Sequence, residues 1–163
     1  ENYQAYELTQ TSNVPAFDYN ILNYINLLKK DGYTITTIIT VENNKMLEDI
    51  HIINIIKECI ETIVQYTTNE RQFDLQLHDS DSYLILKITT HKQNNQLPLL
   101  SIKESDLVRK VDIITNENNE VELRVLFFTK WLLFEFYKKY ITSRPNVFNN
   151  YFNPPKTLKI NSN

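Results

Sequence analysis

The sequence predicts an α/β (α+β) two-layer sandwich with an extra C-terminal helix. A 3.6-residue apolar stripe covers residues 46–67 and predicts a long helix, while β-branched residues fill 33–41 and predict a strand. Two later pairs of short apolar stretches, each joined by a polar turn, predict hairpins. With 163 residues and 42% hydrophobic content, the chain is long enough for one domain with its own core.

The first elements are a helix and a strand. Residues 1–17 show weak strand character and are interpreted as an N-terminal extension that could form an edge strand. Asp18 is expected to cap a helix over 18–30. Basic residues followed by Gly32 are a normal helix stop, after which the strand 33–41 begins.

The centre of the chain is expected to hold the long helix and the first hairpin. Ile52 and Ile55 widen the apolar stripe of the helix, which indicates burial against a sheet. The next strands are expected at 72–78 and 83–89. The remaining expected elements are an irregular loop at 91–103, a short helix at 104–109, a hairpin of strands 111–115 and 120–128, an aromatic helix at 130–141 within the segment 129–144, and an irregular tail at 145–163.

Glycine is nearly absent from this chain, and Gly32 is its single example. At the usual frequency of about 7%, a chain of this length would hold roughly eleven glycines. Loops that wrap a phosphate chain need glycine, because it reaches positive φ without strain and lets backbone N–H groups approach the anion. The sequence therefore excludes a P-loop and a dinucleotide-binding fingerprint.

Charge and cysteine content exclude further classes. A net charge of −3 gives no basic face for nucleic acid. The lone Cys59 excludes an intrachain disulfide and most zinc sites, and fits a reducing cytosol. No apolar stretch is long enough for a membrane span. The chain begins at Glu1 rather than Met, which suggests a fragment; we expect a cytoplasmic domain, or the cytosolic part of a membrane-anchored protein.

The order helix, strand, long helix, hairpin, loop, short helix, hairpin resembles the ATP-binding catalytic domain of sensor histidine kinases, the GHKL or Bergerat fold. In one subfamily Glu-Ala-x-x-Asn-x-x-Lys-His is typical of the long helix, and Glu58-Cys-Ile-Glu-Thr62-Ile-Val-Gln65-Tyr66-Thr67 stands in that register. The match covers about residues 18–128 and is one of pattern more than identity. It implies a Bergerat-like mixed sheet with helices on one face.

The departures from this family pattern fall on its nucleotide site. Thr62 replaces the Asn that helps to hold Mg²⁺ and phosphates, and Gln65 and Tyr66 replace Lys and His. Thr90 and His91 stand where an Asp-x-Gly-x-Gly loop is expected, and the later lid is short. The resemblance therefore implies a pseudo-ATPase without cofactor, metal or catalysis. Its vestigial nucleotide face would comprise Glu58, Thr62, Gln65, Tyr66, Thr90 and His91.

The function expected from this loss is non-catalytic regulation or scaffolding through protein–protein interaction, in a bacterial two-component signalling or envelope-associated system. Four aromatic residues of the helix at 130–141 have the character of interface anchors: Trp131, Phe134, Tyr137 and Tyr140. The helix either covers an open face or edge of the sheet, or binds a partner. That partner would be a second copy or a response-regulator-like protein.

Two alternatives remain open. His51 follows Glu48 and Asp49 and could accept a phosphoryl group, which would make the chain a phosphorelay phosphotransferase component; a structural role is the more common one for such a histidine. The resemblance could also be accidental, in which case the chain is an unrelated small α+β binding module from a virus or phage. His78 and His91 have no partners at ligand spacing, and Cys59 has no basic neighbour that would activate it.

Overall fold

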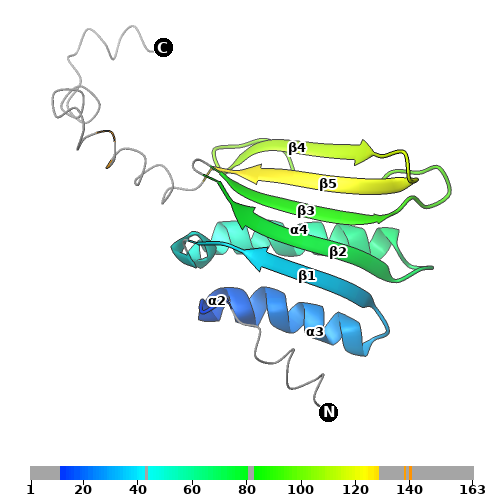
Figure 1. Cartoon of the computed structure of the whole chain (residues 1–163), viewed down its shortest axis with the longest axis horizontal. Coiled ribbons are helices and arrows are strands. Elements are labelled where there is room, and N and C mark those ends of the chain that lie inside the picture. Colours follow the sequence, from blue (N-terminus) through cyan, green and yellow to red (C-terminus); the bar gives the residue numbers. More distant parts are fainter. Residues whose placement is uncertain (1–11, 43, 81–82, 129–137, 139, 141–163) are drawn as a thin grey trace, which may run out of the picture.

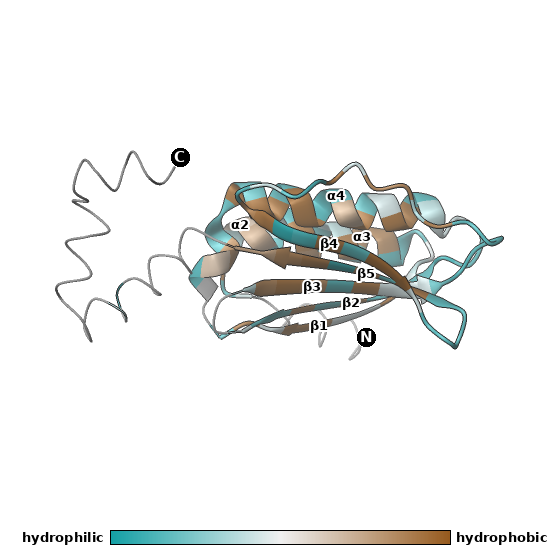
Figure 2. Cartoon of the chain, turned by 90° about the horizontal axis from the view of Figure 1, so that it is seen from above, coloured by the Kyte–Doolittle hydropathy of each residue, from teal (hydrophilic) through white to brown (hydrophobic). Residues whose placement is uncertain are grey.

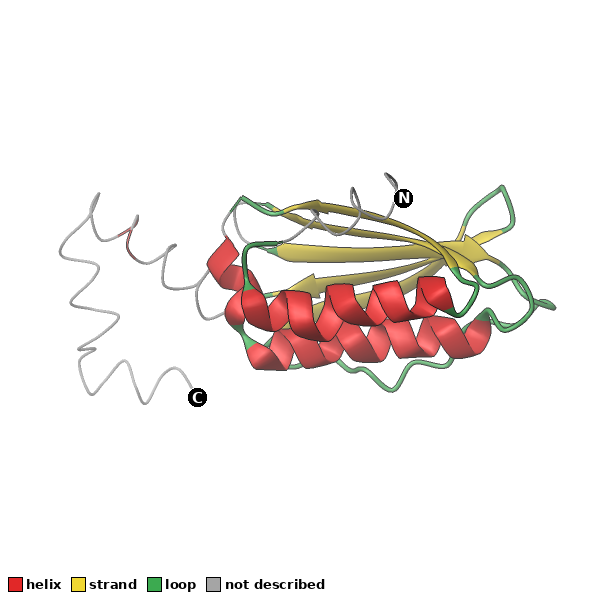
Figure 3. Cartoon of the chain, turned by 90° about the horizontal axis from the view of Figure 1, so that it is seen from below, coloured by secondary structure: helices red, strands yellow, loops and turns green. Residues whose placement is uncertain are grey.

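A five-stranded mixed sheet covered on one face by helices forms the domain, as the computed structural model shows (Figures 1 and 3). The structure describes residues 12–42, 44–80, 83–128, 138 and 140. The predicted α+β class is confirmed. Most of the aromatic segment at 129–144 lies outside the described residues; within it, Lys138 and Tyr140 are helical.

The N-terminal helical stretch begins earlier than expected. It consists of α2 (Pro15–Phe17), a π-helical turn η1 (Asp18–Leu22) and α3 (Asn23–Lys30). Pro15 lies in the first turn, where its missing N–H costs nothing. The expectation that Asp18 is the N-cap is wrong, because its carboxylate accepts hydrogen bonds from the Ser12 amide and hydroxyl at 2.9 and 2.6 Å. Phe17 is fully buried, so the core already starts before Asp18.

Gly32 ends α3 as predicted. Its φ of +95° lies in the left-handed region that favours glycine. The Tyr33 amide donates to the Leu28 carbonyl at 3.0 Å and the Gly32 amide to the Lys29 carbonyl at 3.1 Å, which is the Schellman pattern. The Tyr33 hydroxyl then donates to the Val64 carbonyl at 3.1 Å, so the turn is also tied to the long helix.

The long helix α4 (Ile50–Tyr66) is four residues shorter at its start than expected. A 3₁₀ turn η2 (Asn44–Glu48) precedes it, and Asp49 is its N-cap, whose carboxylate accepts the His51 amide at 2.9 Å. The helix crosses over between two parallel strands, β1 (Thr34–Thr40) and β2 (Gln72–Asp79), and so forms a βαβ unit.

The other strands continue the sheet in antiparallel fashion. They are β3 (Leu84–His91), β4 (Val108–Thr115) and β5 (Glu120–Phe127), and the spatial order is β1-β2-β3-β5-β4. The short helix expected at 104–109 is wrong. The Ser105 hydroxyl instead accepts the Leu107 and Val108 amides at 3.3 and 3.2 Å, which turns the chain directly into β4.

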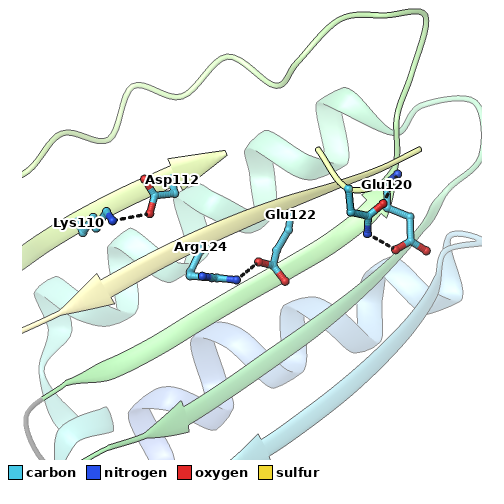
Figure 4. A network of polar contacts seen from close by, with 6 residues as sticks. Lys110, Asp112, Glu120, Glu122 and Arg124 are labelled. Atoms are coloured by element: carbon cyan, nitrogen blue, oxygen red, sulfur yellow. Dashed lines mark hydrogen bonds and ion pairs between the residues drawn. The ribbon is translucent and has the colours of Figure 1, made fainter. Parts of the chain in front are cut away.

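Alternation along the strands separates the two faces of the sheet. On the helix side, β2, β3 and β5 bury every second residue against α4. The opposite face is mostly polar and half-exposed. Figure 4 shows two of its ion pairs, Lys110–Asp112 and Glu122–Arg124, each between neighbours on one strand. Exposed pairs of this kind contribute little stability, so the buried face carries the fold.

No helix in the described part of the chain has the length and apolar character that crossing a membrane requires.

Candidate functional site

A polar stripe on α4 is the candidate site, and the chain's own connection between β3 and β4 contacts it at two points. The stripe consists of Glu58, Thr62 and Tyr66, which recur every four residues and therefore lie on one side of the helix. The connection, residues 92–107, is called the strap below. It runs alongside α4 for much of the helix length (Figure 2).

The strap begins with a tight turn, where the sequence had predicted only an irregular loop. Asn94 and Asn95 both have positive φ, 47° and 57°, and the Gln96 amide donates to the Gln93 carbonyl at 2.9 Å. These values describe a type I′ turn, in which asparagine is one of the residues that tolerate the left-handed region.

Tyr66 holds this turn on the helix. Its hydroxyl donates to the Gln96 carbonyl and accepts the Gln93 amide, both at 2.7 Å. One side chain thus satisfies a main-chain donor and a main-chain acceptor of the same turn. The Lys92 amide also donates to the Asn119 carbonyl at 2.9 Å, which ties the strap to the turn between β4 and β5.

Farther along, the strap descends over the stripe toward the start of α4. The Ser101 hydroxyl donates to the Glu58 carboxylate. Pro98 is buried, and Leu100 and Ile102 pack against the core. Leu97 and Leu99 point the other way and are 47% and 93% exposed. The strap therefore has an inner side that is anchored and an outer side that is apolar and open.

The remaining residues of the face named by the resemblance have structural partners. The Thr62 hydroxyl donates to the Glu58 carbonyl of its own helix at 2.9 Å. Thr90 is buried and donates to the Gln72 carbonyl at 2.7 Å, so it links β3 to β2. The His91 carbonyl accepts the Gln93 side-chain amide at 3.0 Å. Gln65 is exposed beside the stripe.

Chemically, this arrangement offers little to a phosphate chain. Tyr66 is engaged by the strap, Glu58 by Ser101, and Thr62 by its own helix. Within the described residues, no group of three or more His, Cys, Asp or Glu side chains could hold a metal ion.

The other residues singled out in the sequence lie apart from the stripe. His51 is exposed in the first turn of α4, where Asp49 accepts its backbone amide rather than its ring N–H. His78 lies half-buried at the end of β2. Cys59 is fully buried; this burial, and secondarily the Glu58 carboxylate, raise the pKa of its thiol, so the thiolate needed for reaction is suppressed.

Of the four aromatic residues expected to form an interface, Trp131, Phe134 and Tyr137 lie outside the described residues. Tyr140 is helical and half-exposed. Sequence reasoning did not single out Gln96 and Ser101, the strap residues that engage α4 together with Gln93. The Asn94-Asn95 pair was the signal for the turn, since two adjacent asparagines favour a type I′ conformation.

Comparison with models of known protein families and with curated protein sequences gives no significant match to this chain.

Proposed function

We propose that the chain is a non-catalytic regulatory or scaffolding domain that acts through protein–protein contact and is related to the ATP-binding domains of histidine kinases. The observation that carries the proposal is the Tyr66 hydroxyl, which fastens the strap over the α4 stripe. In the resembled family that side of the long helix faces nucleotide. In this chain the strap contacts that side at Tyr66 and Glu58.

The order of elements supports the relationship. A helix, a strand, a long helix, a hairpin, a connection and a second hairpin follow one another, which is the order on which the resemblance rests, apart from the missing short helix. The strap also occupies the place of the family's lid, between the second strand of the first hairpin and the second hairpin. A lid that is fastened down is consistent with a domain that has no nucleotide to enclose.

Energetics argue in the same direction. If a phosphate chain beside Thr62 displaced the strap, the two Tyr66 hydrogen bonds and the packing of Pro98 and Leu100 would be lost. Lifting it would cost roughly 3–5 kcal/mol. Since about 1.4 kcal/mol is a factor of ten in affinity, the strap weakens nucleotide binding by more than about a hundredfold.

We assign the outer side of the strap to protein–protein contact. The outer side of the strap presents Leu97 and Leu99, two exposed apolar side chains two residues apart. The buried lone Cys59 suits a reducing compartment, and for this reason we place the domain in the cytosol.

Calorimetric titration with Mg-ATP tests the proposal. We expect no binding heat from the unchanged chain at millimolar nucleotide, and none from Tyr19→Phe, a control at an exposed position remote from the strap. A micromolar dissociation constant for the unchanged chain would overturn the loss of nucleotide binding. Weak binding that appears only in Tyr66→Phe would identify the strap as the barrier.

A further inference from the structure

The middle of the strap, residues 97–104, has an unpaired main chain. Within the described residues, no main-chain N–H or C=O group of this stretch makes a hydrogen bond. The nearest bonds on either side involve the Gln96 carbonyl, which accepts the Tyr66 hydroxyl, and the Ser105 amide, which donates to the Val108 carbonyl at 2.8 Å. Unpaired backbone groups at a surface are a template for another strand.

Side chains of this stretch alternate between an inner and an outer side. Pro98 is buried, and Leu100 and Ile102 pack against the core. The exposed side chains stand between them and are Leu97, Leu99, Ser101 and Lys103. A period of two is typical of an extended chain. Pro98 favours this form, because its ring fixes its own φ and restricts the preceding residue to extended conformations.

The strap is held in this form before a partner arrives. Tyr66 fastens its start, and the hydrogen bond from Ser101 to Glu58 fastens its middle. Figures 2 and 3 show the strap on the outer side of the helix layer, and no described helix or strand lies outside it. A segment that is already extended and anchored loses little conformational entropy when it binds.

The outer side chains give the strap a chemical pattern. Leu99 is 93% exposed and Leu97 is 47% exposed. Lys103, also exposed, follows on the same side and makes no ion pair within the described residues. Two apolar side chains and a cation therefore stand in a row along the outer side of the strap.

We propose that the strap is a docking site for an extended segment of a partner protein, which pairs with residues 97–103 through main-chain hydrogen bonds as an added β-strand. Proline is tolerated in such edge positions, so Pro98 does not prevent the pairing. The inference names the chemistry of the partner for the protein–protein contact proposed above and in that respect rests on that function.

The pairing fixes which residues the partner segment carries. Residues directly opposite on two paired strands interact through their side chains. The segment therefore carries two apolar residues at alternate positions, opposite Leu97 and Leu99. Opposite Lys103, four positions from the nearer apolar residue, it carries an acidic residue.

A random-peptide library displayed on phage, with the full chain as bait, tests the proposal. We expect the enriched peptides to share two alternating apolar residues and the acidic residue at this spacing. Leu97→Asp/Leu99→Asp should weaken the enriched peptide by more than about tenfold, because the apolar contacts are lost. The matched control Ile114→Asp alters a 40% exposed isoleucine of β4 and should bind the peptide unchanged.

Two further changes separate main-chain pairing from apolar contact alone. N-methylation of the peptide, one position at a time, should abolish binding at alternate residues only, because an added strand pairs along one of its edges. Lys103→Glu should weaken binding, and lysine in place of the peptide's acidic residue should restore it. This restoration also shows that the Lys103→Glu variant is folded.

Three outcomes would overturn strand addition: no enriched peptide, enriched peptides with the apolar spacing of a helix, or binding that tolerates N-methylation at every position. Peptides with helical spacing would leave protein–protein contact standing and remove only the extended partner. Mg-ATP calorimetry remains a separate readout. Nucleotide binding would contradict the proposed function without changing the result of the peptide selection.

Discussion

The hydroxyl of Tyr66, in the last turn of α4, lies 2.7 Å from both the Gln93 amide nitrogen and the Gln96 carbonyl oxygen. A single tyrosine therefore closes the turn that starts the strap and fastens it to the helix. Ser101 and Glu58 make the corresponding contact two helical turns earlier. The strap is thus attached at two points along α4, and each point has one residue that can be changed without disturbing the core.

Tyr66→Phe removes both hydrogen bonds and keeps the ring. Because a net hydrogen bond contributes about 1 kcal/mol, we expect the free energy of unfolding to fall by about 1–2 kcal/mol. We also expect faster hydrogen exchange of the strap amides at 92–103, with little change in β3 and β5. Denaturant titration and exchange mass spectrometry measure the two effects. The control Tyr19→Phe, at a position 75% exposed, should change neither the free energy of unfolding nor the exchange of the strap amides. If the strap amides exchange equally fast in Tyr66→Phe and in the unchanged protein, Tyr66 does not hold the strap.

Gly32→Ala tests the turn after α3. A Cβ at this position would lie 3.6 Å from Arg71 Nη1, which is ordinary contact, so the cost comes from the backbone at φ +95°. We expect a loss of about 1–2 kcal/mol in the free energy of unfolding, the cost of a left-handed conformation for an L-residue. Asp31→Ala is the matched control, because Asp31 is exposed and has φ −84°. Equal losses from both variants would contradict this explanation.

The order of elements could be predicted because apolar periodicity is local information. The stripe of α4 and the alternation of β2 are both legible in the sequence, and both are confirmed. The start of α4 could not be placed, since Met46 and Leu47 are buried in a 3₁₀ turn and continue the apolar pattern before the true cap Asp49. Where a short helix was expected at 104–109, the Ser105 hydroxyl turns the chain and β4 begins at Val108.

The site was predictable only in part. Glu58 was identified as a match to the family pattern and Tyr66 as a departure from it, but the partners of these two residues were not identified. Gln93, Gln96 and Ser101 lie 27 to 43 residues away along the chain, and a hydrogen bond over that separation leaves no periodic signal. The register that brings Ser101 next to Glu58 depends on the type I′ turn and on the packing of Pro98, which are properties of the folded chain.

Thr37→Val tests a buried hydroxyl of β1. Thr37 Oγ1 is buried and makes no hydrogen bond within the described part of the chain. Since a buried unpaired hydroxyl costs about 1–3 kcal/mol and valine has nearly the same shape, we expect this variant to gain about 1 kcal/mol in the free energy of unfolding. The contrasting variant is Thr67→Val, where the buried hydroxyl donates to the Ile63 carbonyl at 2.8 Å. It should lose about 1 kcal/mol. A destabilised Thr37→Val would mean that this hydroxyl is bonded in solution.

Cys59 should be unreactive in the folded protein. Burial, with a smaller effect of the Glu58 carboxylate, raises the pKa of its thiol, so the thiolate fraction at pH 8 is far below that of an exposed cysteine. We expect Ellman's reagent to label Cys59 only as fast as the domain opens, and at once in denaturant. Rapid labelling of the native protein would contradict the burial of Cys59 in α4.

The same shift predicts how stability depends on pH. In the unfolded chain the thiol ionises above its ordinary pKa of about 8.5, whereas the folded chain keeps its proton. Above this pH the unfolded state binds fewer protons than the folded state. The free energy of unfolding is therefore unaffected by Cys59 ionisation below about pH 8.5 and falls above it, by up to about 1.4 kcal/mol per pH unit. Denaturant titrations between about pH 8 and 10 measure this slope. Cys59→Ala, less stable overall because of the lost side chain, should lack this part of the slope; identical slopes in the two proteins would refute the shift.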